Sequence, residues 1–447
     1  MCGRGLGGGI VAFLVAAFGV LPAAGHYGGG SGTEGDPYLI FTAEHLTALG
    51  ASPDDWDKQF RLMADIDLAG HGFAPIGGTD GSFTGVFDGN DRTISHLQLH
   101  LRDTSYTGLF AYVDGAHARI MRVTLNEPNA ISESGRYVAP LVGYLRAGSV
   151  AACHVHAAQI LGDSYIGGLI GRIEQGTVVD CSADAAVMGL SRVGGLVGES
   201  FHGSVCQCSA TGEVVGPPES SCWSVGGLVG RNDHGMISAC TATCTVWGMQ
   251  YIGGLVGENM MGEIDRSWAG GAVAAAHDVG GLAGVNYGGV IANCYATTGV
   301  DGIYAVGGLL GRNGPSCYCS SPTLGYVEHC HAVGRVECLG GTAGLLGEND
   351  RGQVVGCFWN METTGRSASA GGTGLATSQM GARSSFVQAG WDFVEESANG
   401  VEDIWRLREG TGYPVLAWEA PPVDPTPNGE ASVKREPALD KALVVCP

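Results

Sequence analysis

The short block "GGLVG", in slightly varied forms, recurs nine times along this chain. The commonest interval between blocks is 27 residues, and the two longest intervals contain extra residues, "PPESS" (217–221) and "PSCYCSSPT" (315–323). A unit of this size cannot bury its own apolar face, whereas stacked copies can. The repeat therefore predicts a solenoid. The leucines that mark the blocks are Leu109, Leu141, Leu169, Leu196, Leu228, Leu255, Leu282, Leu309 and Leu345.

The residues between the blocks also align in columns once the two insertions are removed. A glycine follows most marker leucines by seven residues, and a valine or isoleucine stands two residues later. These apolar runs are short, β-branched and bounded by glycine, without a 3.6-residue period, which is typical of strands. Parallel copies stacked in register place equivalent side chains about 4.8 Å apart. The chain is predicted to be all-β, a parallel β-helix of about nine turns with three short strands in each.

The glycines of "GGLVG" have two candidate roles. A phosphate cradle is disfavoured, because no Lys-Ser/Thr follows the motif and the motif recurs in every turn. We expect instead that these glycines provide positive φ at turns and allow close approach between successive turns.

Two polar columns support stacking in register. One holds asparagine in five successive turns, and amides stacked in this way can hydrogen-bond along the axis. The preceding position alternates in charge, as neighbouring parallel strands would favour. The asparagines are Asn232, Asn259, Asn286, Asn313 and Asn349. The charge column runs Arg172, Glu199, Arg231, Glu258, Val285, Arg312 and Glu348.

Seven of the 15 cysteines occupy a single column, two residues before a column of alanines. This alternation predicts an inward-facing stack of small side chains, where reduced cysteine packs well. Side chains that point the same way have poor disulfide geometry. Cys222, Cys317 and Cys319, in or beside the insertions, are the better disulfide candidates. The column consists of Cys153, Cys181, Cys208, Cys240, Cys294, Cys330 and Cys357.

The repeats resemble the GLUG-repeat family, whose units follow a "GGLVG…N…G.I..CYATG.V.G" pattern. The segment "VGGLAGVNYGGVIANCYATTGVDG" (279–302) is an especially close match, and the resemblance covers most of residues 106–356. It implies a right-handed β-solenoid in an exported bacterial surface or secreted protein. Some members carry an IgA-cleaving metallopeptidase, but this chain has no H-E-x-x-H motif, so that activity is not inferred.

Five segments are expected along the chain. Residues 1–25 contain an apolar run with small residues before His26, typical of a secretory signal peptide. Residues 26–104 should form an N-terminal cap, with a short helix capped by Thr42. Residues 105–356 form the solenoid, and 357–420 resemble the family's closing module, with tryptophans in core and cap packing. Residues 421–447 are expected to be a linker or disordered tail. The tryptophans are Trp359, Trp391, Trp405 and Trp418.

Candidate catalytic and metal-binding residues are sparse. Asp65 and Asp67 share a strand face, and Asp88 follows in "FDGN", but no acid recurs with a basic neighbour from turn to turn. Two histidine pairs flank column cysteines, and strand alternation should turn them toward solvent and away from the cysteines, so that they form no zinc site. The pairs are His154 with His156 and His329 with His331. We expect neither cofactor nor metal.

The composition limits the classes of partner that this chain is expected to bind. A net charge of −21 disfavours nucleic acid, and no later segment is apolar enough to span a bilayer. The favoured function is a non-enzymatic, secreted or cell-surface scaffold or adhesin that contacts a glycan or protein through its insertions. The alternative is a carbohydrate-active β-helix, such as a polysaccharide lyase or glycan-binding protein. The residues expected to bind in the insertions are Pro217, Glu219, Trp223, Pro315 and Tyr318.

Overall fold

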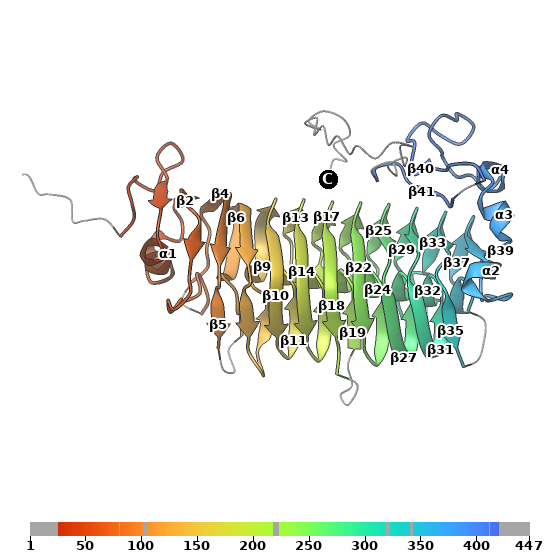
Figure 1. Ribbon diagram of the computed structural model, residues 1–447, viewed down its shortest axis with the longest axis horizontal. Helices are drawn as coiled ribbons and strands as arrows, with labels where there is room; N and C mark the ends of the chain where they lie inside the picture. Colours follow the sequence, from red (N-terminus) through yellow and green to blue (C-terminus); the bar gives the residue numbers. More distant parts are fainter. Residues whose placement is uncertain are drawn as a thin grey trace, which may run out of the picture.

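The computed structural model describes residues 26–79, 81–101, 105–217, 223–317, 322–339, 343–410 and 412–419. In these residues 39 strands form one continuous sheet, wound into a right-handed parallel β-helix (Figure 1). The predicted fold class is confirmed. The predicted signal peptide (1–25) and tail (421–447) lie outside the described residues, as do Glu219 and Tyr318.

A regular turn contains four strands, one more than predicted, and in the later turns the fourth is divided in two, as in β26 (Trp268–Ala269) and β27 (Ala272–Gly280). In the turn marked by Leu196 the four strands are β15 (Ser191–Gly194), β16 (Val197–Phe201), β17 (Ser204–Cys206) and β18 (Ser209–Val215). Each strand pairs in parallel with its equivalent in the neighbouring turns. We call the four sets of equivalent strands columns one to four.

The bounds of the remaining solenoid strands follow these columns. Column one contains β8 (Arg136–Val138), β11 (Ser164–Gly167), β19 (Trp223–Gly226), β23 (Gln250–Gly253) and the ends of the long strands β27 (Ala272–Gly280) and β31 (Gly299–Gly307). Column two contains β12 (Ile170–Ile173), β20 (Val229–Asp233), β24 (Val256–Met260), β28 (Ala283–Tyr287), β32 (Leu310–Gly314) and β36 (Leu346–Asn349). Column three contains β13 (Thr177–Val179), β21 (Met236–Ser238), β25 (Glu263–Asp265), β29 (Val290–Ala292), β33 (Tyr326–Glu328) and β37 (Gln353–Val355). Column four contains β7 (Asn129–Ile131), β10 (His154–Leu161), β14 (Ser182–Met188), β22 (Thr241–Trp247), β26 (Trp268–Ala269), β30 (Tyr295–Ala296), β34 (His331–Ala332), β35 (Val336–Cys338) and β38 (Phe358–Asn360). Strands β6 (Phe110–Asn126) and β9 (Val142–Ala151) are long and bend through more than one column.

The core is built from in-register apolar columns. All nine marker leucines have no exposed surface. In column three the β-branched residues face one another across every turn: Val150, Val178, Val205, Ile237, Ile264, Ile291, Val327 and Val354. The apolar period of the sequence therefore appears directly as packing along the axis.

The "GGLVG" glycines serve close approach rather than left-handed turns. A Cβ atom on Gly254 would collide with the carbonyl oxygen of Gly281 in the next turn, and neither glycine has positive φ. The left-handed corners are formed mostly by other residues, such as His202 (φ 52°) and Gln207 (φ 53°). The expectation of positive φ at these glycines was wrong, because the turn needs the glycine where two backbones meet, not at the corner.

The N-terminal end of the solenoid is closed by irregular turns and one helix. Helix α1 (Ala43–Gly50) begins at Thr42, whose hydroxyl accepts the amide of His45 at 3.4 Å. It lies at the end of the stack (Figure 1). A cluster of buried phenylalanines fills the interior beneath it: Phe60, Phe83, Phe87 and Phe110. The other elements of this end are β1 (Tyr38–Ile40), η1 (Pro53–Asp55), β2 (Gln59–Leu62), β3 (Ile66–Asp67), β4 (Val86–Ser95) and β5 (Gln98–His100).

The C-terminal residues form a module with its own core. Trp391 and Trp405 are fully buried in it, Trp359 is instead buried in the core of the solenoid, and Trp418 is 41% exposed. The module sits at the far end of the solenoid and folds back along its flank (Figure 1). Its elements are α2 (Met361–Thr364), β39 (Thr373–Leu375), α3 (Thr377–Met380), α4 (Arg383–Val387), β40 (Trp405–Arg406) and β41 (Val415–Leu416).

Candidate functional site

The asparagine column forms a continuous hydrogen-bonded ladder. Each Nδ2 donates to the Oδ1 of the next turn, at 2.9 Å from Asn232, 2.8 Å from Asn259, 3.0 Å from Asn286 and 3.1 Å from Asn313 to Asn349. The same amides also donate to the carbonyl of the glycine that follows in their own turn. The first four side chains have no exposed surface. Because these four side chains are buried, their polar atoms are not available to a ligand.

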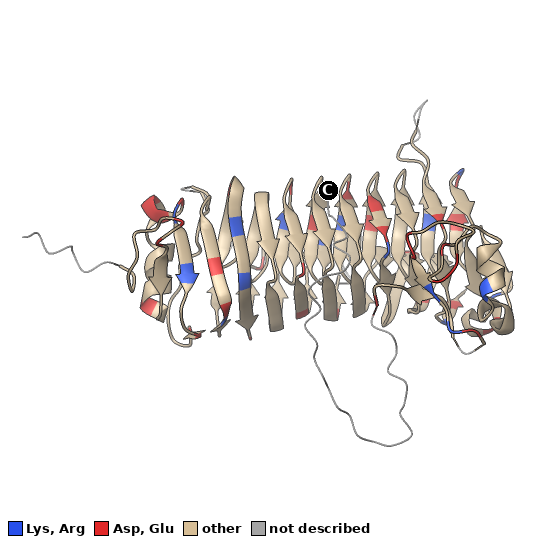
Figure 2. Ribbon diagram, turned by 90° about the horizontal axis from the view of Figure 1, so that it is seen from above, with Lys and Arg blue, Asp and Glu red and all other residues tan. Residues whose placement is uncertain are grey.

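The alternating charge column forms ion pairs between turns. Glu199, only 4% exposed, lies 2.9 Å from Arg172 Nε and 3.0 Å from Arg192 Nε. Arg312 bridges Glu348 of the next turn and Asp278, each at 2.9 Å. Burial raises the pKa of Glu199, although the three nearby arginines act in the opposite direction. Figure 2 shows both signs of charge distributed along the solenoid.

The cysteine column lies in the core. All seven of its members are free and at most 2% exposed. Neighbouring members touch through backbone amides, as in the Cys153 amide to Cys181 Sγ contact at 3.4 Å and the same contact from Cys330 to Cys357. Burial raises the pKa of the Cys330 thiol well above its ordinary value. These thiols are therefore buried packing groups in the described part of the chain.

The residues in and beside the insertions include a disulfide-bonded cysteine and one β-bridge. Cys317 is disulfide-bonded, whereas Cys222 and Cys319 lie outside the described residues. Cys206 on β17 is also disulfide-bonded, which the column pattern did not predict. Pro315 is buried and closes the second insertion in an antiparallel bridge with Leu324.

The first insertion is flanked by described residues on both sides. Pro217 is its first residue, and Trp223, which follows it at the start of β19, is 49% exposed. Of the five residues expected to bind a partner in the insertions, Trp223 is the one that the described structure exposes as a large apolar side chain.

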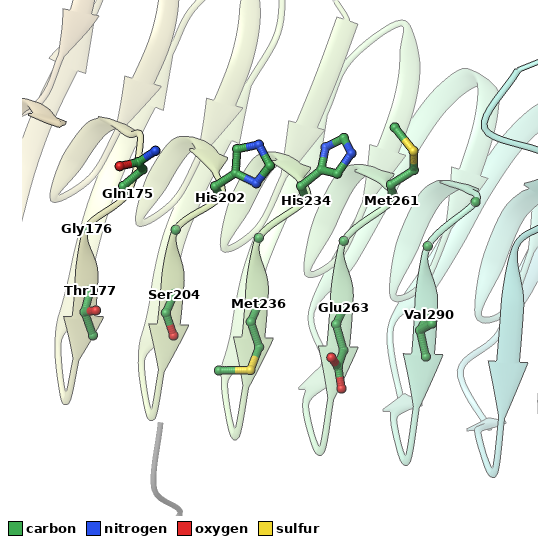
Figure 3. Close-up of a pocket in the computed structure, with 15 residues that line it drawn as sticks. Gln175, Gly176, Thr177, His202, Ser204, His234, Met236, Met261, Glu263 and Val290 are labelled. Carbon is green, nitrogen blue, oxygen red and sulfur yellow. The ribbon is translucent and has the colours of Figure 1, made fainter. Parts of the chain in front are cut away.

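A shallow groove of about 480 Å³ runs across several turns at the corner between columns two and three (Figure 3). Its floor is the glycine column, including Gly235 and Gly262. One wall carries His202 and His234, whose rings lie 4.9 Å apart. The opposite wall carries Thr177, Ser204, Met236, Glu263 and Val290.

The glycine floor of this groove follows from the ladder beneath it. A Cβ atom on Gly262 would lie 2.7 Å from Asn259 Oδ1, inside van der Waals contact. The groove is therefore a consequence of packing, and its wall residues change in type from turn to turn.

The early carboxylates are held in structural contacts. Asp88 is 7% exposed and pairs with Arg122 at 2.7 Å and Arg61 at 3.1 Å. Asp67 contacts His96 at 2.7 Å, and Asp65 accepts the amide of Thr93 at 2.9 Å. Among the described residues, no group of three or more His, Cys, Asp or Glu side chains could hold a metal ion.

One histidine departs from expectation. His154 and His329 are half-buried and His156 is exposed, but His331 has no exposed surface. It does point outward from the solenoid, as alternation requires, yet the C-terminal module covers it. Its Nε2 donates to the carbonyl of Pro414 at 2.9 Å, and burial lowers its pKa to about 4.

Two aromatic stacks were not recognised in the sequence. The first pairs five tyrosines near columns one and two with arginine side chains: Tyr106, Tyr112, Tyr137, Tyr144 and Tyr165. The second is the outward column Trp268, Tyr295, His331 and Phe358, which replaces Thr241 and Ser209 of earlier turns. The change from hydroxyl to aromatic side chains in this column was the available signal that the last turns are covered.

Comparisons with known proteins place these observations in context. The GLUG motif model matches residues 162–188, 221–246 and 275–300. Halomucin of Haloquadratum walsbyi is 33% identical over 35% of this chain, and a protein of Evansella cellulosilytica described as a candidate Gly-rich membrane protein is 36% identical over 20%. These matches span 2% and 11% of the two relatives. In the described segments, no helix has the length and apolarity needed to traverse a bilayer.

A solved structure is among the proteins that match this chain. It is described as a candidate immunoglobulin A1 protease from Bacteroides ovatus, and it covers 89% of this chain and 96% of its own, with 17% identity and a TM-score of 0.38. That likeness is too low to support an argument about activity. The three motif matches fall on turns of the solenoid, so this chain carries GLUG repeats.

Proposed function

We propose that this protein is a non-enzymatic, exported scaffold at the cell surface, whose solenoid holds binding segments away from the cell. The proposal rests on one observation, which is how the side chains of the polar columns are bonded. The asparagine ladder and the arginine–glutamate column are bonded to themselves along the axis. A side chain committed in this way stabilises the rod and has no free capacity for catalysis.

The relatives support a surface role. One is named Halomucin and the other is described as a membrane protein, and each matches part of this chain. Localisation is tested by expressing the chain in its bacterial host, fractionating the cells and labelling whole cells with an antibody to the solenoid. The proposal predicts label on intact cells or protein in the medium. Protein confined to the cytosol would contradict it.

A carbohydrate-active role is the second candidate, and the glycine-floored groove is the observation that favours it. It predicts release of reducing or unsaturated ends from neutral or acidic polysaccharides, measured by chromatography after long incubation. Loss of that release in the variant His202→Ala/His234→Ala would locate the activity in the groove. The scaffold proposal predicts no release at any protein concentration.

A further inference from the structure

A cleft of about 910 Å³ lies between the C-terminal module and the flank of the solenoid. One wall is a corner column of the solenoid that includes Asp180, Gln207 and Arg266. The other wall carries Glu402, Asp403, Ile404, Ala417 and Trp418 of the module. Its size lies within the range of roughly 300–1,000 Å³ that is typical of small-molecule sites.

The module wall is fixed in place on both sides of the cleft. The indole N–H of Trp418 donates to the carbonyl of Arg266 at 3.0 Å. Next to it, both carboxylate oxygens of Glu419 accept the hydroxyl of Tyr295, at 2.9 and 3.0 Å. The amide of Ala417 donates to the carbonyl of Ile404 at 2.9 Å. The cleft is thus formed by two rigid parts of the chain that are far apart in sequence.

The polar side chains that line this cleft are not used by the fold. Among the described residues, the side chains of Asp180, Gln207, Glu402 and Asp403 make no hydrogen bond or ion pair with a neighbour, and all four are exposed. Trp418 is 41% exposed although its N–H is bonded, so the exposed part is the apolar ring. This differs from the polar columns of the solenoid, which are bonded to themselves.

The charge of the cleft selects among ligands. Arg266, its only cation among the described lining residues, is paired with Asp265 at 2.6 Å. Three carboxylates remain without a cationic partner, so an anionic ligand such as a uronate or sulfated glycan is repelled. An apolar ring beside several acceptors and an amide suits a ligand with apolar C–H faces and many hydroxyl groups.

We propose that this cleft binds a short neutral oligosaccharide, with a sugar ring against Trp418 and its hydroxyl groups on Asp180, Gln207, Glu402 and Asp403. Successive turns place the corner side chains Asp180 and Gln207 about 4.8 Å apart along the axis. A chain of pyranose rings laid along the corner meets Asp180 and Gln207 in adjacent turns, then Ala239 and Arg266. This site goes beyond the scaffold role, and its test uses purified protein, so its failure leaves the surface proposal unaffected.

Isothermal titration calorimetry on the full chain tests the proposal with five probes: cellotriose, N-acetylated chitotriose, a chitosan trimer, trigalacturonate and trilysine. The proposal predicts binding of at least one of the two neutral trimers and none of trigalacturonate. Preference for the cationic chitosan trimer with no binding of the neutral sugars would overturn it, because charge alone would then explain the site. The same holds if trilysine binds and the neutral sugars do not.

Four variants locate the site. Asp180→Ala/Gln207→Ala leaves every contact of the module intact and should weaken binding roughly tenfold or more, as should Trp418→Ala. Trp418→Phe keeps an aromatic ring but loses the hydrogen bond to Arg266. If this variant still binds the sugar, the ring contact matters for binding and the hydrogen bond that holds the module does not. The matched control Gln98→Ala/His100→Ala, at two exposed positions of β5 away from the cleft, should bind normally. Unchanged binding in the first variant, or loss in the control, would overturn the assignment.

Discussion

Asn232 donates its amide to Asn259 at 2.9 Å, but its own Oδ1 finds no hydrogen-bond partner among the described residues. The residue opposite it in the preceding turn is Ser200, whose buried hydroxyl is also without a partner. The ladder therefore stops where the column changes from asparagine to the shorter serine. Its free end is a buried acceptor, which is costly in a dry core.

Ser200→Asn should extend the ladder by one turn. The new amide would donate to Asn232 Oδ1 and to the carbonyl of Gly203, repeating the geometry of every later turn. We expect stability to rise by about 1 kcal/mol, measured by guanidinium unfolding of the full chain. The control Ser200→Ala removes the hydroxyl without adding an amide and should not stabilise to the same extent. If Ser200→Asn is less stable than Ser200→Ala, the ladder does not account for this column.

Glycine should be replaceable only where the next turn leaves room. Gly254→Ala places a methyl group against the backbone of Gly281, which cannot move away without disturbing its own turn. At Gly299 the nearest atom to an added Cβ is 3.9 Å away. We expect Gly254→Ala to cost about 2–3 kcal/mol and Gly299→Ala much less, compared by thermal unfolding. Equal tolerance at both positions would mean that the turns are further apart than the structure has them.

Docking of the C-terminal module should weaken in acid because of His331. Its pKa is about 4 in the folded chain against 6.5 in an exposed histidine. A lowered folded pKa gives stability that is present above pH 6.5 and lost as the pH falls toward 4, here up to about 3 kcal/mol. Burial raises the pKa of Glu419, which acts in the opposite direction and favours the docked state when that carboxyl is protonated.

Hydrogen exchange in residues 383–419 at pH 7, 5.5 and 4.5 measures this effect. The wild-type chain should lose protection there while the central turns stay protected. His331→Phe keeps the aromatic stack with Tyr295 and removes the titrating group, so its protection should depend less on pH. An identical pH dependence in the two chains would show that another group is responsible.

The column cysteines should not react with thiol reagents until the solenoid unfolds. All are buried and reduced, and burial raises the pKa of Cys208 and Cys357 well above the ordinary value. Only a thiolate reacts readily. A chromogenic disulfide reagent should therefore label the seven column positions in 6 M guanidinium and not in buffer, with sites assigned by mass spectrometry. Disulfides joining column members in the untreated protein would contradict the reduced ladder.

Much of the solenoid could be predicted from sequence, because its contacts repeat at a fixed spacing. The amides of Asn259 and Asn286 are 27 residues apart and meet in space, so one period predicts both. The C-terminal module is different. The contact between His331 and Pro414 joins a repeat to a segment without a period, and nothing local marks it. The corner residues were also missed, because His202 adopts a conformation more typical of glycine.

The sequence alone also could not predict that the polar side chains of the cleft form a candidate site. Asp180 and Gln207 occupy one corner position in adjacent turns. From the sequence alone they would be interpreted as ordinary solvent-exposed residues. They become candidates only because Trp418, more than 200 residues away, lies opposite them. The insertions attracted attention in the sequence since they break the period, but a site formed by docking leaves no such break.

The central claim is that equivalent residues lie directly above one another through both insertions. Residues Ser149 and Gln353 belong to one column-three position, separated by seven in-register pairings through Thr177, Ser204, Met236, Glu263, Val290 and Tyr326. Nitroxide labels on Ser149→Cys and Gln353→Cys, measured by pulsed electron paramagnetic resonance, should give one narrow distance near 34 Å. A broad distribution, or a distance displaced by more than one turn, would contradict the stacked solenoid.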